Sequence, residues 1–216
     1  MKKDKIIWAP LSSKNFSKVT DAALEQHAES EHDSEDKIKL LKHQKIVKSY
    51  ISPDTPFRGV LLYHGLGSGK TCSAISISEG LKHDRKTVVF LPGSLKDNFI
   101  HELEKCANKI YIAPRRHWVF KKYNDTTKDE LNKIIPKAIL EDLGGGWVAD
   151  STKSTNYSKL SKKFQKQIKE QIKHKIDEQY SLIHYNGVNK EHLEKMKKDR
   201  ILDDSLVIVD EAHNII

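Results

Sequence analysis

The stretch HGLGSGKT, residues 64–71, decides how the rest of the chain is interpreted. It follows an apolar run at 60–63 and precedes a helix-forming segment at 72–81. A strand, a glycine-rich turn and a helix in this order predict a phosphate-binding loop. Glycines let the backbone wrap closely, and the loop N–H groups and the helix N-terminus then direct positive dipoles at a phosphate.

Two side chains at the end of this stretch supply the chemistry that such a loop needs. Lys70 places a positive charge at the β- and γ-phosphates, and the Thr71 hydroxyl is a hard oxygen ligand suited to Mg²⁺. His64 stands where the general pattern has glycine, so we interpret the loop as a variant. The alternative, an ordinary glycine-rich turn with a stray lysine, is the weaker one because a strand and a helix flank the loop. The predicted nucleotide-binding residues of the loop are Gly65, Gly67, Ser68, Gly69, Lys70 and Thr71.

Composition sets broad limits on the kind of protein. The chain has 216 residues with 37% hydrophobic and 31% charged side chains, which allows one sizeable α/β domain plus a tail. The net charge of +8 favours a polyanionic partner such as DNA or RNA, although a solvated lysine-rich surface explains the charge equally well. No apolar run approaches the ~20 residues of a membrane span, so we expect no membrane association.

The two cysteines, Cys72 and Cys106, form neither a metal-binding spacing nor a disulfide framework. We expect Cys72 to be a buried helix residue beside the loop. An intracellular, reducing compartment fits this cysteine usage.

We interpret the beginning of the chain as an extension that precedes the folded lobe. Residues 25–36 carry six acidic side chains and few apolar ones, so we expect a mobile linker. We therefore predict an N-terminal extension at 1–36 and one ATP-binding lobe at 37–216.

The lobe begins with a predicted helix at 36–50, which contains Gln44. A glutamine amide offers both a donor and an acceptor, which can match the edge of adenine. A solvent-exposed glutamine is the commoner explanation of any single glutamine, and the sequence alone leaves both open.

Apolar runs alternate with helical patterns along the lobe. The runs at 59–63, 87–91, 181–185 and 206–209 suit strands that are covered on both faces, as in parallel sheets. We predict that Ser94 caps the helix after the second run. The fold class is therefore α/β, with a doubly wound, mainly parallel sheet and helices on both faces.

A lysine-rich helical insertion is predicted at around 125–180. A capping box at Thr127 and Glu130 starts one helix that reaches Ile139 and is ended by the glycines at 144–146, and a short strand at 118–120 precedes it. Further helices are predicted at 158–179, and from Asn189 to about Arg200.

Two basic segments of this insertion leave alternatives open. The helix at 158–175 carries seven lysines against the single acid Glu170, which suits either phosphate contacts or a solvated face. Residues 115–123 interleave basic and aromatic side chains that can stack on exposed bases, although a half-buried strand explains them better.

A second chemical motif closes the last apolar run. Asp210 and Glu211 follow four aliphatic residues, and ligands of open parallel sheets lie at the carboxyl ends of the strands. There Asp210 can hold Mg²⁺ through water, and Glu211 can orient and deprotonate an attacking water. A lone Asp-Glu pair is more often a solvated loop start, but a phosphate-binding loop upstream favours the functional interpretation.

The combination of motifs resembles a known enzyme family. The sequence DEAH at 210–213 is similar to the Walker B motif of DEAH-box superfamily 2 helicases and translocases, and GSGKT at 67–71 is similar to their motif I, or Walker A. VFLPGSLKDNF at 89–99 resembles motif Ia, and His43-Gln44 resembles the adenine-sensing Q motif. YHGLGSGKT at 63–71 looks most like nucleoside triphosphatase I and the early transcription factor ATPases of large DNA viruses.

This resemblance implies two RecA-like lobes with ATP and Mg²⁺ between them. The chain would then be the first lobe, incomplete at its C-terminus, with the arginine finger on a missing second lobe. The resemblance further implies that His213 couples hydrolysis to nucleic acid, which Ser94, Lys96 and Asn98 contact. It also implies a role in viral transcription, a viral RNA polymerase as partner, and a location in the virion or host cytoplasm.

Two other classes of function stay open on the sequence alone. One is a phosphate-loop motor that does not act on nucleic acid, against which the motif Ia similarity argues. The other is a catalytically idle interaction module, against which the intact Lys70, Thr71, Asp210 and Glu211 argue.

Overall fold

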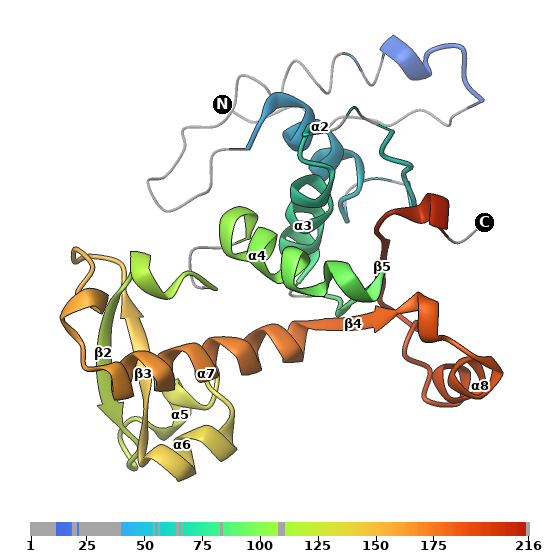
Figure 1. Ribbon diagram of the computed structural model, residues 1–216. Coiled ribbons are helices and arrows are strands. Elements are labelled where there is room, and N and C mark those ends of the chain that lie inside the picture. The colour runs from blue at the N-terminus through green and yellow to red at the C-terminus, as the bar shows by residue number, and fades with distance from the viewer. Residues whose placement is uncertain are drawn as a thin grey trace.

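The computed structural model describes residues 12–18, 21, 40–53, 55, 57–63, 65, 67–82, 84–107 and 111–214. In this part of the chain a three-stranded parallel sheet has the order β4-β1-β5, and a two-stranded antiparallel sheet joins β2 and β3 (Figure 1). The α/β class and the parallel sheet are confirmed, and they are compatible with a RecA-like lobe. His64, Leu66 and most of the first 36 residues lie outside the described residues.

Three of the four predicted parallel strands are confirmed within a residue. They are β1 (Thr87–Leu91), β4 (Tyr180–His184) and β5 (Leu206–Val209). β1 lies in the centre, with Leu91 opposite His184 of β4 and Phe90 opposite Val209 of β5. Because all three strands are parallel, their carboxyl ends lie at one edge of the sheet.

The prediction of a strand at 59–63 is wrong. This segment forms no strand ladder, and Leu61 and Tyr63 are 82% and 93% exposed. An apolar run becomes a strand only when a neighbouring backbone offers it hydrogen bonds. In the described residues the parallel sheet consists of β4, β1 and β5, and the segment at 59–63 pairs with none of them.

Three helices accompany the glycine-rich loop and the first strand. They are α2 (Lys42–Tyr50), α3 (Lys70–Leu81) and α4 (Lys96–Cys106). The predicted cap at Ser94 is wrong, because a 3-10 turn at Gly93–Leu95 comes first and α4 has no side-chain cap. Phe99 and Leu103 share the buried face of α4, as their spacing requires.

The insertion between α4 and β4 contains a hairpin flanked by helices. β2 (His117–Lys122) pairs antiparallel with β3 (Gly145–Asp150), and β3 was not predicted. The single helix predicted from Thr127 to Ile139 is wrong, because α5 (Lys128–Leu131) and α6 (Lys137–Leu143) are separate. Pro136 lies between them, and proline cannot continue a helix that precedes it. Gly144 ends α6 at a φ of 63°, as predicted.

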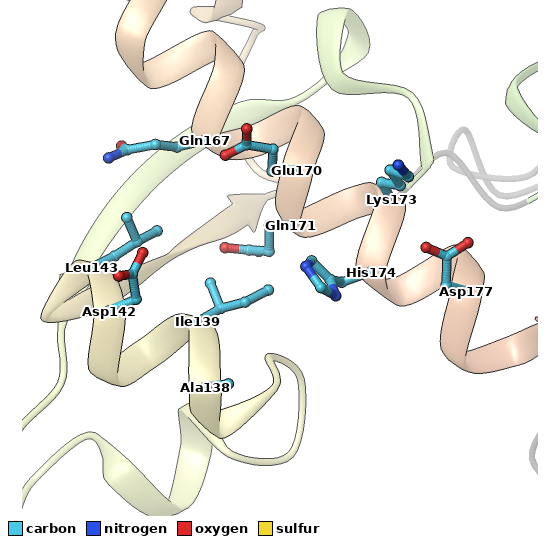
Figure 2. A pocket seen from close by; sticks show the side chains of 10 residues that line it. All are labelled: Ala138, Ile139, Asp142, Leu143, Gln167, Glu170, Gln171, Lys173, His174 and Asp177. Atoms are coloured by element: carbon cyan, nitrogen blue, oxygen red, sulfur yellow. The ribbon is translucent and has the colours of Figure 1, made fainter.

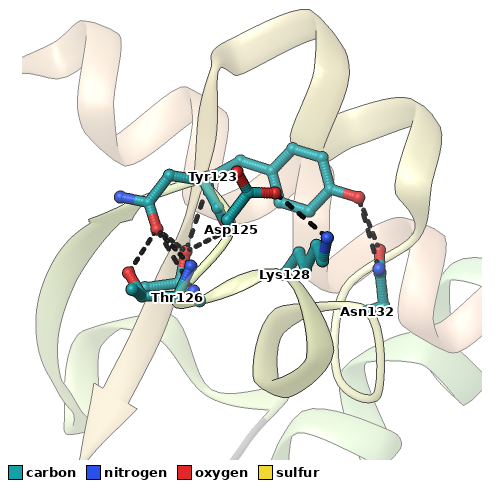
Figure 3. A network of polar contacts seen from close by, with 7 residues as sticks. Tyr123, Asp125, Thr126, Lys128 and Asn132 are labelled. Atoms are coloured by element: carbon teal, nitrogen blue, oxygen red, sulfur yellow. Dashed lines mark hydrogen bonds and ion pairs between the residues drawn. The ribbon is translucent and has the colours of Figure 1, made fainter.

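A compact polar turn connects β2 to α5 (Figure 3). Thr127 does not cap α5 with its side chain, because its hydroxyl donates to the carbonyl of Lys122. Asn124 Oδ1 accepts from the backbone N–H and the hydroxyl of Thr126, the Asx-turn that short polar side chains favour. The turn is therefore held by its own side chains.

Two further helices flank β4, and both have a conventional N-cap. α7 (Lys162–Gln179) begins at Ser161, whose hydroxyl accepts from the N–H of Phe164, and it leads directly into β4 (Figure 1). α8 (Lys190–Lys198) begins at Asn189, as predicted, and it buries none of its side chains.

One hydrophobic core joins the parallel sheet to the insertion. It contains Ile75 of α3, Val89 of β1, Phe99 of α4, Trp147 of β3 and Ile168 of α7. A smaller cluster beneath α2 includes Phe57, and Phe16 packs edge to face on that ring. Among the described residues, no helix is long and apolar enough to cross a membrane.

Candidate nucleotide-binding site

The predicted site residues gather around the carboxyl edge of the parallel sheet. Pro92–Asn98 follow β1, Tyr185–Gly187 follow β4, and Asp210–His213 follow β5. Gly93 lies against the ring of His184, where a Cβ would come within 3.7 Å of Nδ1. The segments after β1 and β4 are therefore neighbours at this edge.

The glycine-rich loop turns through two left-handed residues. Gly67 and Gly69 both have a φ of 76°, a conformation that only glycine adopts at little cost. α3 begins directly afterwards at Lys70, so its free N–H groups lie in the loop. The loop thus has the backbone form that binds an anion at a helix N-terminus.

Helix α2 holds this loop from behind. His43 Nε2 lies 2.9 Å from the carbonyl oxygen of Ser68, and Gln44 Nε2 donates to the carbonyl of Gly69 at 3.3 Å. The Gln44 side chain is 5% exposed, so the interpretation as an ordinary exposed glutamine is wrong. Its Oε1 also accepts from the N–H of Leu41, which leaves Gln44 occupied within the protein. A Cβ at Gly69 would come within 2.6 Å of Gln44 Nε2, so a larger residue would displace the Gln44 amide as well as strain the left-handed backbone.

One hydroxyl of the loop has a hydrogen-bonding capacity that the protein does not use. Ser68 Oγ is buried and has no hydrogen-bond partner among the described residues. Buried polar groups of native proteins are nearly always paired. A phosphate oxygen in the loop would give Ser68 an acceptor, so the loop fits a polyphosphate ligand.

Asp210 lies at the end of β5 and interacts with Lys70 across the edge. Its N–H donates to the carbonyl of Phe90, which fixes the residue to β1. Burial and the neighbouring Glu211 carboxylate raise the pKa of Asp210, whereas the Lys70 ammonium lowers it. A lysine and a carboxylate that interact in this way can bind one metal–triphosphate together.

Glu211 is held in an unusual backbone conformation. Its φ of 51° is uncommon for a side chain other than glycine and marks a constrained position. The Tyr185 hydroxyl donates to its carbonyl at 3.2 Å, and His213 Nδ1 lies 3.3 Å from Glu211 Oε2. The end of β4 therefore helps to place the acidic motif.

The remaining predicted residues lie near this edge without close contacts that define a role. Ser94, Lys96 and Asn98 are exposed around the start of α4, and Gly65 is exposed in the loop. Thr71 is partly buried in the first turn of α3. Sequence reasoning missed Tyr185, because its contact with Glu211 depends on strand order.

The prediction that the two cysteines are unpaired is wrong. Cys72 of α3 and Cys106 of α4 form a disulfide with a Cα–Cα distance of 5.3 Å. Glu102 lies beside the pair, with Oε2 3.4 Å from Cys72 Sγ. No local spacing marks this pair, because 34 residues separate the two positions.

Comparisons with known proteins point to viral helicases. No protein-family model matches the chain, and no solved structure matches it. Over 175 residues the chain is 31% identical to "Putative ATP-dependent RNA helicase R563" of Acanthamoeba polyphaga mimivirus, covering 80% of this chain and 24% of the relative. It is 32% identical over 191 residues to "Putative ATP-dependent RNA helicase L377" of the same virus, covering 82% and 15%.

A shorter match reaches a different viral protein. The chain is 35% identical over 60 residues to "Termination factor NPH-I homolog" of African swine fever virus, covering 28% of this chain and 8% of the relative. The chain thus spans a quarter or less of the length of each of these three relatives. Together, these similarities support a place for the chain in a helicase superfamily.

Proposed function

We propose that this chain is the ATP-binding lobe of a nucleic-acid-dependent ATPase of the helicase or translocase type. The observation that carries the proposal is the form of the glycine-rich loop, in which the left-handed Gly67 and Gly69 lead directly into the N-terminus of α3 and the buried hydroxyl of Ser68 has no partner among the described residues. Such a loop suits the phosphates of a nucleotide. The names of the two mimivirus relatives, which are described as ATP-dependent RNA helicases, support the same activity.

Each residue of the site has a chemical role in this proposal. Lys70 and the loop N–H groups neutralise the β- and γ-phosphates of ATP, and Ser68 donates its unused hydroxyl hydrogen there. Thr71 and Asp210 would hold Mg²⁺, Asp210 through water, and the ion would supply positive charge beside the phosphoryl oxygens. Glu211 orients the attacking water and takes its proton.

Two residues would act beside this centre. His213, which contacts the Glu211 carboxylate, couples hydrolysis to nucleic acid. Gln44 contributes to the nucleotide site, and its buried contact with Gly69 gives it a second role in holding the loop. Ser94, Lys96 and Asn98 contact DNA or RNA at the start of α4.

The finer assignment follows from the motif similarity. We place the chain with the DEAH-box members of superfamily 2, as the first of two RecA-like lobes. A second lobe would supply an arginine finger, so the 216-residue chain binds ATP weakly and turns it over very slowly. In the intact protein hydrolysis drives movement along DNA or RNA during viral transcription, beside a viral RNA polymerase.

Nucleotide binding by the 216-residue chain tests the site directly. We expect a fluorescent ATP analogue to bind in the presence of Mg²⁺ and to bind less tightly after EDTA is added. Lys70→Ala should weaken binding about 10- to 100-fold, the factor that corresponds to the loss of one charge-assisted hydrogen bond. Lys82→Ala is a matched control just beyond the other end of α3, where Lys82 pairs with Glu79 at 2.8 Å. Equal affinities of wild type and Lys70→Ala would contradict the proposal.

Stimulation by nucleic acid separates the proposal from its alternatives. In the full-length protein, we expect DNA or RNA to accelerate ATP hydrolysis and Lys70→Ala to abolish it. A rate of ATP hydrolysis that is unchanged by added DNA or RNA would indicate a motor that acts on another substrate. A full-length protein that binds no ATP analogue would indicate an idle module.

A further inference from the structure

The insertion carries a large share of the positive charge of the protein. Residues 111–179 have fifteen lysines and arginines against nine acidic residues, a net charge of +6, whereas the whole chain has +8. Residues 37–110 and 180–216, which form the sheet and its nucleotide edge, have eighteen basic against thirteen acidic residues, a net charge of +5. A polyanion is therefore attracted to the insertion as well as to the sheet.

Four lysines of α7 form one continuous line. Lys162, Lys166, Lys169 and Lys173 are spaced by four, three and four residues, and such positions share one face of a helix. All four are exposed. We call this set the α7 stripe, and at 1.5 Å per residue it is about 16 Å long.

The opposite face of α7 is fixed to the core. Ile168, Ile172 and Ile176 are buried there, and Gln171 joins the helix to the hairpin. Its Oε1 accepts from the N–H of Trp147 at 3.0 Å, and its Nε2 donates to the Trp147 carbonyl at 2.7 Å. The α7 stripe therefore stands on a rigid support, which lowers the entropy lost when a ligand binds.

A pocket beside α7 contains two of its acidic residues and one lysine of the stripe. Glu170, Asp177 and Lys173 line this pocket of about 450 Å³ between α6 and α7, in which Gln171 and His174 point towards α6 (Figure 2). Only Lys166 of the stripe has an ion pair, with Glu170 at 3.8 Å, among the residues that the structure describes. Three ammonium groups of the stripe thus have no ion-pair partner among the described residues and are available to a phosphate backbone.

The position of the stripe separates it from the nucleotide edge. α7 leads into the first residue of β4, so its lysines precede the strand, whereas the predicted nucleotide residues follow strand ends (Figure 1). The α7 stripe is therefore a second basic surface, distinct from Lys70 and from Lys96.

We infer that the α7 stripe binds the phosphate backbone of a nucleic acid strand, without reading its bases. Lysines supply charge but no base-specific hydrogen-bond pattern in this row, and about 16 Å matches about five nucleotides at 3.4 Å each along one strand. The inference deepens the proposed function, on which it rests, by locating a contact that keeps the strand near the ATPase.

Binding of 20-nucleotide single strands of RNA and of DNA to the 216-residue chain tests this inference. Fluorescence anisotropy at 50–200 mM KCl would compare wild type with the quadruple variant K162Q/K166Q/K169Q/K173Q. Each single-strand phosphate contact adds about 0.7 to the magnitude of the slope of log affinity against log salt. The slope measured for the quadruple variant should therefore be smaller in magnitude by up to about 3. Wild type should then lose up to about 50-fold more affinity over this range than the variant does.

A matched control separates the stripe from net charge. K190Q/K195Q/K197Q/K198Q removes the same four charges from α8, where successive steps of 100° spread these lysines around the helix. We expect the control to change affinity less than threefold. Equal losses in both variants, or wild-type affinity of the α7 variant, would overturn the inference and leave the proposed function standing.

Two further outcomes are distinguishable in the same experiment. A wild-type chain that binds neither RNA nor DNA would count against the nucleic-acid part of the proposed function itself. Displacement of both strands by equal charge concentrations of polyglutamate would overturn the inference, because the surface would then bind any flexible polyanion.

Discussion

The nucleotide edge of the sheet and the insertion at 111–179 use their polar side chains in opposite ways. At the edge, the buried hydroxyl of Ser68 has no partner among the described residues, and the pKa of Asp210 is raised by burial. In the insertion, Gln171 satisfies both the N–H and the carbonyl of Trp147, and Asn156 does the same for Trp118. These two amides of the insertion therefore serve its own fold, whereas the Ser68 hydroxyl at the edge is unused within the described part of the chain.

This difference indicates where ligands bind. A buried polar group without a partner costs stability, and folded proteins keep such groups mainly where a ligand completes them. The recognisable motifs all lie at the edge, and the insertion has none. The exception within the insertion is the α7 stripe, whose lysines face solvent rather than the core.

The largest effect that we expect on stability comes from Trp147→Ala. Trp147 is buried, packs against Phe120 and Phe164, and donates its indole N–H to Gln167. Loss of a buried tryptophan should lower the free energy of unfolding by about 3–5 kcal/mol, measured by urea denaturation. Phe164→Ala, at a ring that is 42% exposed, is the control and should cost clearly less. A loss below about 1 kcal/mol for Trp147→Ala would show that the insertion does not depend on this ring.

Two substitutions that remove a polar side chain test the comparison between the edge and the insertion. One should have an intermediate effect on the free energy of unfolding and the other a small effect. Gln171→Ala leaves the N–H and carbonyl of Trp147 unpaired, so unfolding free energy should fall by about 1–3 kcal/mol. Ser68→Ala removes a hydroxyl that has no partner in the described part of the chain, so stability should stay within about 0.5 kcal/mol. Binding of an ATP analogue should weaken only in Ser68→Ala, and the reverse pattern would refute the contrast between the two regions.

Local signals in the sequence sufficed for most elements of the parallel sheet. β1 and β5 are uniform apolar runs, and α8 begins at the asparagine that its sequence predicts. The loop and the acidic motif could be predicted for the same reason, since each is contiguous. Parallel strand ends also predict that Lys70 lies close to Asp210, but the strand at 59–63 that this prediction needs is not formed.

The elements that were missed depend on contacts between distant residues. In β3, Gly145 and Gly146 suggested only the end of a helix, yet Cβ atoms there would strike the Lys121 carbonyl and Ile135. These glycines permit close packing of the hairpin, which no local pattern reveals. The segment at 59–63 has the composition of a strand but no hydrogen-bonding neighbour among the described residues. In both cases the deciding partner lies elsewhere in the chain.

Asp210→Asn should have the smallest effect on the free energy of unfolding, and it should raise this free energy rather than lower it. Because burial raises the pKa of Asp210, the folded protein holds this proton to a higher pH than the unfolded chain, whose aspartates titrate near 3.9. The contribution of Asp210 to stability is therefore fully present below about pH 3.9 and is lost as the pH rises through the pKa of Asp210 in the folded protein. At pH values above this folded pKa, Asp210→Asn should be more stable than wild type in the absence of ligand.

Urea denaturation of wild type and Asp210→Asn between pH 4 and 7.5 measures this difference. Subtracting the two curves removes the pH dependence that both proteins share. The gain in Asp210→Asn should be accompanied by a loss of the Mg²⁺-dependent stabilisation by ATP, because the proposed metal carboxylate is gone. A variant that is less stable than wild type throughout the range would mean that Lys70 and Asp210 act as a structural ion pair. The edge would then resemble the insertion, with its charges used for folding rather than reserved for a ligand.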